Sequence, residues 1–124
     1  MPRLMSVAFT EAAVREQRKT VTRRKGWAFL KPGDRLTLCR KVMGRRNGEP
    51  LVRIADVEVV SVRREHLQAM TLDRTYGEAE VALEGCAPMS PEDFVYHYFE
   101  WKQKIPRNTE VTRIEWRYLD EEAD

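Results

Sequence analysis

The 124-residue sequence predicts an α+β fold, in which a small, mostly antiparallel β-barrel has about three helices packed across its openings. Three observations lead to this prediction. Apolar and polar residues alternate in several short segments, which is the period of a half-buried strand. The turn-forming pairs Pro32-Gly33 and Asn47-Gly48 separate such segments, so neighbouring strands are expected to connect as hairpins. Helical spacing of apolar residues is clearest in one segment, 90–103, and regular β-α-β units are not indicated.

The N-terminal part of the chain is predicted to form a strand, a helix and a second strand. Residues 4–9 alternate as a strand would. Thr10 is a good N-cap, and the helix that it begins is expected to end near Arg18. Residues 19–24 are basic and contain the β-branched residues that strands favour.

The middle of the chain predicts a β-hairpin. Proline presets φ and glycine allows a positive φ in the turn 31–34, and strand character follows at 36–42. The pair Asn47-Gly48 favours a tight hairpin turn, with the return strand at 51–62. The apolar residues of that return strand change phase near Asp56, which predicts a β-bulge there.

The C-terminal part is predicted to contain helical pieces at 63–88, a helix at 90–103 and a final strand at 112–118. Ser90 is an N-cap candidate, and Pro91 suits the first helical position. An aromatic stripe of Phe94, Tyr98 and Trp101 is expected to pack this helix on the barrel. The predicted barrel core includes Leu36, Leu38, Ile54, Ile114 and Trp116.

Composition places the chain among globular proteins with a heavily charged surface. Apolar residues make up 42% and charged residues 34%, enough for one domain, which we expect at 1–119, followed by an acidic disordered tail at 120–124. No apolar run is long enough for a membrane span, and a polar N-terminus predicts a cytoplasmic protein. The two cysteines and two histidines match no metal-ligand spacing, so no metal or cofactor is expected.

Charge is distributed unevenly along the chain. Residues 1–53 have a net charge of +10 and residues 54–124 a net charge of −8, which together give the net charge of +2. One interpretation is a basic face for a phosphate-bearing partner. The other is that the two halves interleave in the fold and neutralise each other.

Residues 17–24, QRKTVTRR, and the turn 31–34 resemble the ASCH domain family. The signature of that family is Gly-x-Lys-x-x-Glu-x-Arg, before a Pro-Gly-Asp turn. Lys19 and Arg24 fill its lysine and arginine positions, whereas Gln17 and Thr22 replace its glycine and glutamate. The resemblance extends over nearly the whole chain in element order. It implies a PUA-like β-barrel, a fold associated with RNA.

With threonine at position 22, residues 18–24 resemble the ASCH subgroup that hydrolyses N(4)-acetylcytidine, whose motif is Arg-Lys-Thr-x-Thr-x-Arg. That subgroup is thought to use a lysine, a threonine and a glutamate without a metal. The resemblance therefore implies Lys19 and Thr22 as catalytic residues. Glu84, six residues before Ser90, is the best match for the glutamate, and Glu78 and Glu80 are poorer ones.

The alternative function is an RNA-binding module without catalysis, whose partner is an RNA instead of a nucleoside. Its basic side chains would hold phosphates, and Trp27 or Tyr76 would stack a base, although Trp27 is also a candidate for the core. The expected contacts are Arg18, Arg23, Arg24, Lys25, Trp27, Arg45 and Arg46.

Overall fold

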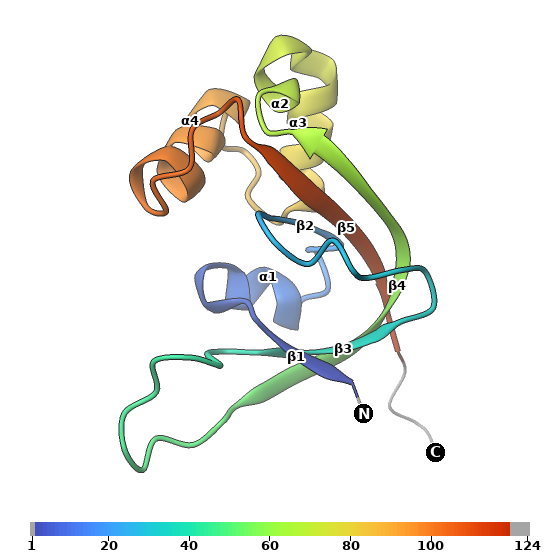
Figure 1. Ribbon diagram of the computed structural model, residues 1–124, viewed down its shortest axis with the longest axis vertical. Helices are drawn as coiled ribbons and strands as arrows, with labels where there is room; N and C mark the ends of the chain where they lie inside the picture. The colour runs from blue at the N-terminus through green and yellow to red at the C-terminus, as the bar shows by residue number, and fades with distance from the viewer. Residues whose placement is uncertain (1, 120–124) are drawn as a thin grey trace.

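The structure, a computed structural model, describes residues 2–119, so the predicted tail 120–124 lies outside it. Figure 1 shows the arrangement of the helices and strands. In chain order the elements are β1 (Arg3–Ser6), the 3-10 turn η1 (Ala8–Thr10), α1 (Glu11–Arg15), β2 (Val21–Arg24), β3 (Arg35–Cys39), β4 (Arg53–His66), α2 (Ala69–Leu72), α3 (Arg74–Leu83), α4 (Pro91–Val95), the π-helical segment η2 (Tyr96–Trp101) and β5 (Glu110–Tyr118). The fold class is α+β, as predicted.

The five strands form one curled sheet in the order β1-β3-β4-β5-β2. The β1–β3 pair is parallel and the other three pairs are antiparallel. The prediction of a mostly antiparallel barrel is therefore corrected to a mixed, open half-barrel. The barrel stays open because β1 and β2 are its two edges and do not pair with each other, although the long strand β4 bends strongly between them (Figure 1).

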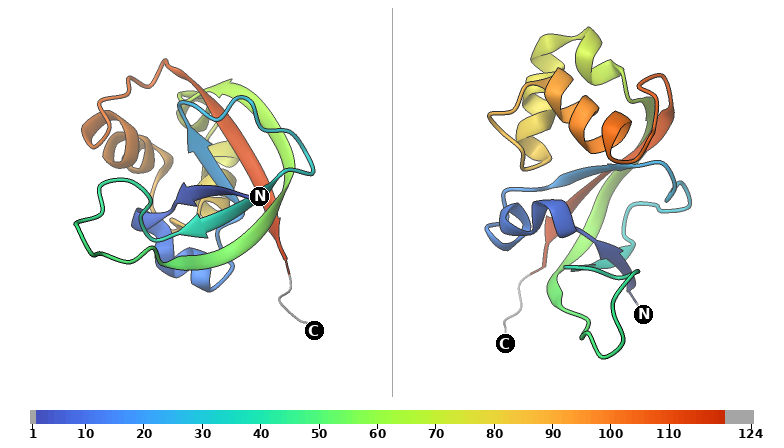
Figure 2. Two further views of the ribbon diagram at one scale, coloured as in Figure 1. Left: turned by 60° about the horizontal axis from the view of Figure 1, so that its bottom comes forward. Right: turned by 90° about the vertical axis from the view of Figure 1, so that its left-hand side faces the viewer.

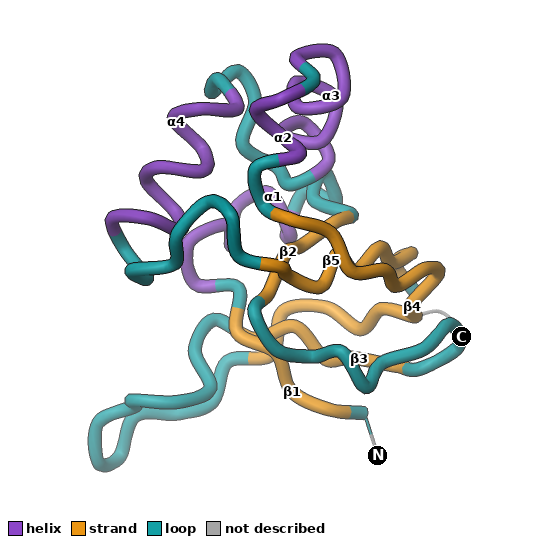
Figure 3. The backbone as a smooth tube through the Cα atoms, turned by 45° about the horizontal axis from the view of Figure 1, so that its top comes forward, coloured by secondary structure: helices purple, strands orange, loops and turns teal. Residues whose placement is uncertain are grey.

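Two apolar cores stabilise the molecule. The first fills the half-barrel and includes Leu36, Leu38, Ile114 and Trp116, all predicted, with the predicted Ile54 only partly buried against it. The second joins α2, α3, α4 and η2 to the far ends of β4 and β5, with Phe94 and Val111 among its buried residues. Figure 2 shows these helices as a layer at one end of the sheet, and Figure 3 shows the same separation of helices from strands.

Local signals in the sequence predicted several turns and caps correctly. Ser90 Oγ accepts a hydrogen bond from the Asp93 backbone N–H at 3.1 Å, and Pro91 begins α4. Gly33 has a φ of 95°, and the Asp34 carboxylate accepts from the Lys31 backbone N–H at 3.0 Å. Asx hydrogen bonds and a positive φ are what such turns require.

Strand ends and register were predicted less well. The first strand stops at Ser6, and Phe9 is 61% exposed in η1. Strands β3 and β4 do pair antiparallel, and Asn47-Gly48 forms a tight turn in which the Glu49 N–H donates to the Arg46 carbonyl at 2.9 Å, but this turn lies within a wide loop, 40–52, and does not join the two strands directly. Strand β4 is irregular at two places: its register against β3 shifts between Ala55 and Arg53, close to the predicted position near Asp56, and its register against β5 shifts between Val59 and Ser61. No helix within the described residues 2–119 is long and apolar enough to cross a membrane.

Candidate functional site

A pocket of about 430 Å³ lies at the open seam of the half-barrel, between the segment that follows β1 and the edge strand β2. This volume is in the usual range for small-molecule sites. Its walls combine charged groups with apolar and aromatic groups. The lining residues include Val7, Ala8, Phe9, Lys19, Thr22, Arg24, Glu84, Phe94, Tyr98 and Phe99.

Lys19 is positioned by the way α1 ends. The helix stops at Arg15, shorter than predicted, because Gln17 has a φ of 59°. The Gln17 N–H donates to the Val14 carbonyl and the Arg18 N–H to the Ala13 carbonyl, which is the hydrogen-bond pattern of a Schellman cap. This cap turns the chain so that Lys19, two residues later, is buried at the start of β2.

Two aromatic side chains of β5 hold the backbone of Lys19. Trp116 Nε1 donates to the Lys19 carbonyl at 3.1 Å, and the Tyr118 hydroxyl donates to the same oxygen. The Lys19 carbonyl is therefore fixed, and its side chain projects from a rigid base.

Glu84 is positioned by a second helix end of the same type. It is the C-cap of α3, and Gly85 follows it with a φ of 85°. A Cβ on Gly85 would lie 2.5 Å from Ala13 Cβ and 3.1 Å from Lys19 Cβ, so glycine permits this close approach. The Thr20 N–H also donates to the Leu83 carbonyl at 2.8 Å. The ends of α1 and α3 thus meet backbone to backbone.

The two helix ends bring Lys19 and Glu84 into direct contact, although they are 65 residues apart in the sequence. Lys19 Nζ donates to Glu84 Oε1 at 2.9 Å and to the Glu84 carbonyl at 3.0 Å. Both side chains are 3% exposed. An ammonium group has three donors, so one donor of Lys19 remains for the pocket that it lines.

Thr22 lies on the same wall of the pocket, and its hydroxyl is bound by the neighbouring arginine. Arg24 Nε donates to Thr22 Oγ1 at 3.2 Å, while Arg24 Nη2 crosses the open seam and donates to the Ser6 carbonyl at 2.7 Å. Within residues 2–119, no direct hydrogen bond joins Thr22 to Lys19 or Glu84. The three residues share the pocket without forming one continuous chain of hydrogen bonds.

Arg23, one residue before Arg24, also lines the pocket, but its side chain is fully buried. Its nitrogens donate to Glu84 Oε2 and Glu65 Oε2, each at 2.9 Å, and also to Glu80. Burial alone would lower the pKa of Arg23, but the charges of Glu84 and Glu65 outweigh burial and raise it above its ordinary value. Arg23 has no exposed side-chain surface to offer an RNA phosphate.

The carboxylates around Arg23 are themselves matched by further donors. Arg113 Nε donates to Glu80 at 2.7 Å, and the Tyr76 hydroxyl donates to Glu65 at 2.7 Å. Burial opposes the charge of Glu80, but the hydrogen bonds from Arg113 and Arg23 keep its pKa below the ordinary value. Basic residues of the N-terminal half thus interleave with acidic residues of the C-terminal half at this network.

The other predicted RNA contacts are dispersed over the surface. Arg18, Lys25, Arg45 and Arg46 are exposed. The loop with Arg45 and Arg46 and the segment with Lys25 project on different sides of the molecule (Figures 1 and 2). Trp27 is half-buried, packs against the barrel core and lies 5.5 Å from the ring of Phe29 between centroids.

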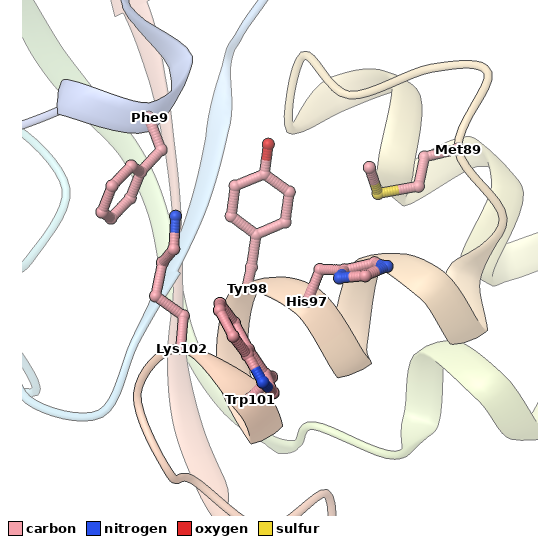
Figure 4. A pocket seen from close by; sticks show the side chains of 6 residues that line it. All are labelled: Phe9, Met89, His97, Tyr98, Trp101 and Lys102. Carbon is pink, nitrogen blue, oxygen red and sulfur yellow. The ribbon is translucent and has the colours of Figure 1, made fainter.

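A second hollow of about 260 Å³ adjoins the pocket, and Phe9 and Tyr98 line both. Figure 4 shows its aromatic side chains from η1 and η2, with the Lys102 ammonium 3.9 Å from the centroid of the Phe9 ring. This hollow was not predicted from the sequence. Phe9 was expected in a strand and Trp101 in a packing stripe, but Trp101 is 58% exposed because η2 is π-helical and departs from the 3.6-residue period.

Metal ligation has no candidate in this part of the chain. Among residues 2–119, no three His, Cys, Asp or Glu side chains are grouped to hold a metal ion. Cys39 is buried and Cys86 is half-buried, and both are free thiols. The pocket itself is lined by a lysine, a threonine, arginines and a glutamate.

Comparison with known proteins gives a likeness of fold. No family model and no curated protein matches the sequence. The crystal structure of hypothetical protein PH0355 is similar, with a TM-score of 0.60 and 16% sequence identity over 95% of this chain and 97% of that one. At this level of identity, the likeness supports the α+β half-barrel architecture alone.

Proposed function

We propose that this protein is an ASCH-type amidohydrolase that removes the acetyl group from N(4)-acetylcytidine or a related N(4)-acylated cytosine nucleoside. The observation that carries the proposal is that Lys19, Thr22 and Glu84 all line one pocket. Its volume of about 430 Å³ suits a small molecule, and its aromatic walls suit the flat face of a base.

The backbone at Gln17 supports the resemblance to the ASCH family. The family signature has glycine at this position, and Gln17 has a φ of 59°, in the left-handed region that favours glycine. The chain thus keeps the backbone geometry of the signature while its residue differs. The Lys19–Glu84 contact at 2.9 Å likewise supports the assignment of Glu84 over Glu78 and Glu80 as the glutamate of the set.

The first chemical step is attack by Thr22. A threonine hydroxyl needs a base, and a lysine acts as a base only as a neutral amine. The Lys19–Glu84 pair provides this form when the proton between Nζ and Oε1 resides on Glu84. The Lys19 amine then takes the hydroxyl proton, Thr22 Oγ1 bonds to the acetyl carbon, and the carbonyl electron pair moves onto its oxygen.

The second step expels the cytosine amine. The carbonyl re-forms, the C–N bond breaks, and its electron pair goes to the exocyclic nitrogen, which takes the proton from Glu84. Lys19 is now an ammonium and Glu84 a carboxylate, so the ion pair is restored and Thr22 holds an acetyl ester. Water then attacks this ester by the same proton transfers, which frees the Thr22 hydroxyl and releases acetic acid. All atoms and protons balance without a metal.

The test is turnover of N(4)-acetylcytidine by the native protein and by matched threonine variants, followed by chromatographic separation of cytidine. Thr22→Val keeps the side-chain volume and removes the hydroxyl, so its kcat is expected to fall at least about a thousandfold. Thr22→Ser is expected to retain measurable activity. Thr20→Ala is the control, because Thr20 is close in sequence and does not line the pocket.

Two outcomes contradict the proposal. Full activity of Thr22→Val would exclude the threonine nucleophile. No turnover of any N(4)-acylcytidine by the native protein would exclude the enzyme altogether. The remaining hypothesis would then be the RNA-binding module, whose affinity should weaken steeply with salt and lose salt dependence when Arg45 and Arg46 are neutralised.

A further inference from the structure

Arg24 differs from the other cations that line the pocket. Lys19 is paired with Glu84, Arg23 with three carboxylates, and Lys41 Nζ lies 3.7 Å from Glu49. Within residues 2–119, the guanidinium of Arg24 forms no ion pair, and its hydrogen bonds go to a hydroxyl and a backbone carbonyl. It is a positive charge without a negative partner.

The donors of Arg24 show where a partner would lie. Nε is bound to Thr22 Oγ1 and Nη2 to the Ser6 carbonyl, whereas Nη1 has no hydrogen-bond partner among the described residues. No buried side-chain nitrogen or oxygen of these residues lacks a partner, so Nη1 is not sealed in the core. Arg24 lines the pocket, and both N–H donors of Nη1 are unbound within residues 2–119.

The surroundings of Arg24 make it receptive to negative charge. Burial lowers the pKa of Arg24, and the charge of Glu84 only partly opposes this effect. The Glu84 carboxylate is already bound by Lys19 and Arg23. A partly buried cation that lacks a counter-charge gains more from a new anion than a paired or fully solvated cation does.

We propose that Arg24 is a catalytic residue that stabilises the negative oxygen of the tetrahedral intermediate formed on Thr22. This inference rests on the proposed function. Arg24 Nε is 3.2 Å from the oxygen that attacks, so the carbonyl oxygen of the attacked group comes to lie beside the same guanidinium. The neutral acetyl carbonyl gains little there, whereas the oxyanion gains a charge-assisted hydrogen bond from Nη1.

The hydrogen bond from Nε also orients the nucleophile. Thr22 Oγ1 accepts from Arg24, so the hydrogen of the hydroxyl itself has to point elsewhere and is available to a base. The bond of Nη2 to the Ser6 carbonyl fixes the guanidinium across the seam between β1 and β2. Arg24 is thus held in place before substrate arrives, which is what electrostatic stabilisation of a transition state requires.

The hydrogen bond to Ser6 also gives Arg24 a structural role, which is to hold the edge strands β1 and β2 together. The experiment separates this role from the catalytic one. Steady-state kinetics on N(4)-acetylcytidine are measured for the native protein, Arg24→Lys and Arg24→Ala. Arg40→Ala is the control, because Arg40 is an exposed arginine paired with Glu11 outside the pocket. We expect both Arg24 variants to lose about 10²–10³-fold in kcat, while KM changes less than about threefold. Added guanidinium ion should restore part of the kcat of Arg24→Ala without raising its melting temperature.

Each other outcome overturns the inference in a recognisable way. An active native protein whose Arg24→Ala variant keeps its kcat leaves the amidohydrolase in place and removes Arg24 from its chemistry. If kcat falls in step with the melting temperature and guanidinium does not restore it, Arg24 only holds the edge strands β1 and β2 together. An inactive native protein removes the proposed function and this inference together.

Discussion

Two neighbouring arginines of strand β2, Arg23 and Arg24, differ in how their positive charges are balanced. Arg23 is fully buried and meets the carboxylates of Glu65, Glu80 and Glu84, and a second arginine, Arg113, completes the network. Arg24, the next residue, forms no ion pair within residues 2–119 and lines a pocket. Matched buried charges hold the half-barrel against the helices, whereas the unmatched charge lies at the pocket where we propose that it acts on the reacting group.

The largest effect that separates the two arginines is expected in stability. Arg23→Met removes the cation that Glu65, Glu80 and Glu84 share, so each of these carboxylates keeps only one other cationic partner and the free energy of unfolding should fall by about 3–5 kcal/mol. Arg24→Met removes the hydrogen bonds to Ser6 and Thr22 but also removes a partly buried, unpaired charge, and about 1 kcal/mol or less is expected. Urea unfolding at pH 7 measures both. Equal losses in the two variants would contradict the distinction between matched and unmatched charge.

A smaller effect is expected in how the free energy of unfolding declines at acid pH. The pKa of Glu80 is below its ordinary value of 4.5, so the folded state binds the proton more weakly than the unfolded state does. Its contribution is therefore present above pH 4.5 and is lost as the pH falls through the lower folded pKa. Glu80→Gln should cost about 2–3 kcal/mol at pH 7 and flatten the decline below pH 4.5.

Glu78→Gln is the matched control, because Glu78 lies on the same helix and its side chain is 57% exposed. Its unfolding free energy should follow the native curve from pH 7 to pH 3 within about 0.5 kcal/mol. If Glu80→Gln kept the full acid dependence of the native protein, the network would not be the origin of that dependence.

The sequence predicted features that depend on a few neighbouring residues. The cap at Ser90, the turn at Pro32-Gly33 and the burial of Leu36 and Leu38 follow from local hydrogen bonding or from a period of two, and all are present. The open seam was not predictable in this way, because alternation shows which face of a strand is buried but not whether two edge strands meet.

Contacts between residues far apart in the sequence limited how much of the candidate site could be predicted. Arg23 and Arg24 are the same residue type in one basic run, and only the folded chain shows that three carboxylates, 42 to 61 residues away, surround the first. The resemblance to the ASCH family grouped Lys19 with Glu84, but no local rule shows whether residues 65 apart meet, and only the folded chain shows their contact. Phe9 and Trp101 were misplaced because a 3-10 turn and a π-helical segment interrupt the regular periods.

The smallest predicted effect concerns the two helix ends that bring Lys19 and Glu84 together. Gln17 and Gly85 occupy equivalent positions after α1 and α3, with φ values of 59° and 85° and the same pair of capping hydrogen bonds. A residue with a Cβ is strained in this region, whereas glycine is not, although glycine has a more disordered unfolded state. Gln17→Gly should therefore raise the free energy of unfolding by about 0.5–1 kcal/mol.

Gly85→Ala is the opposite test of the same geometry. The added Cβ would be strained by φ and would also lie 2.5 Å from Ala13 Cβ, so this variant should lose at least about 2 kcal/mol. Thermal or urea unfolding of both variants measures the contrast, and Gln17→Gly should leave the pocket chemistry unchanged because Gln17 does not line the pocket. A loss of stability in Gln17→Gly would mean that contacts of the glutamine side chain outweigh backbone strain, and the helix end at Lys19 would then not be held by the same means as the one at Glu84.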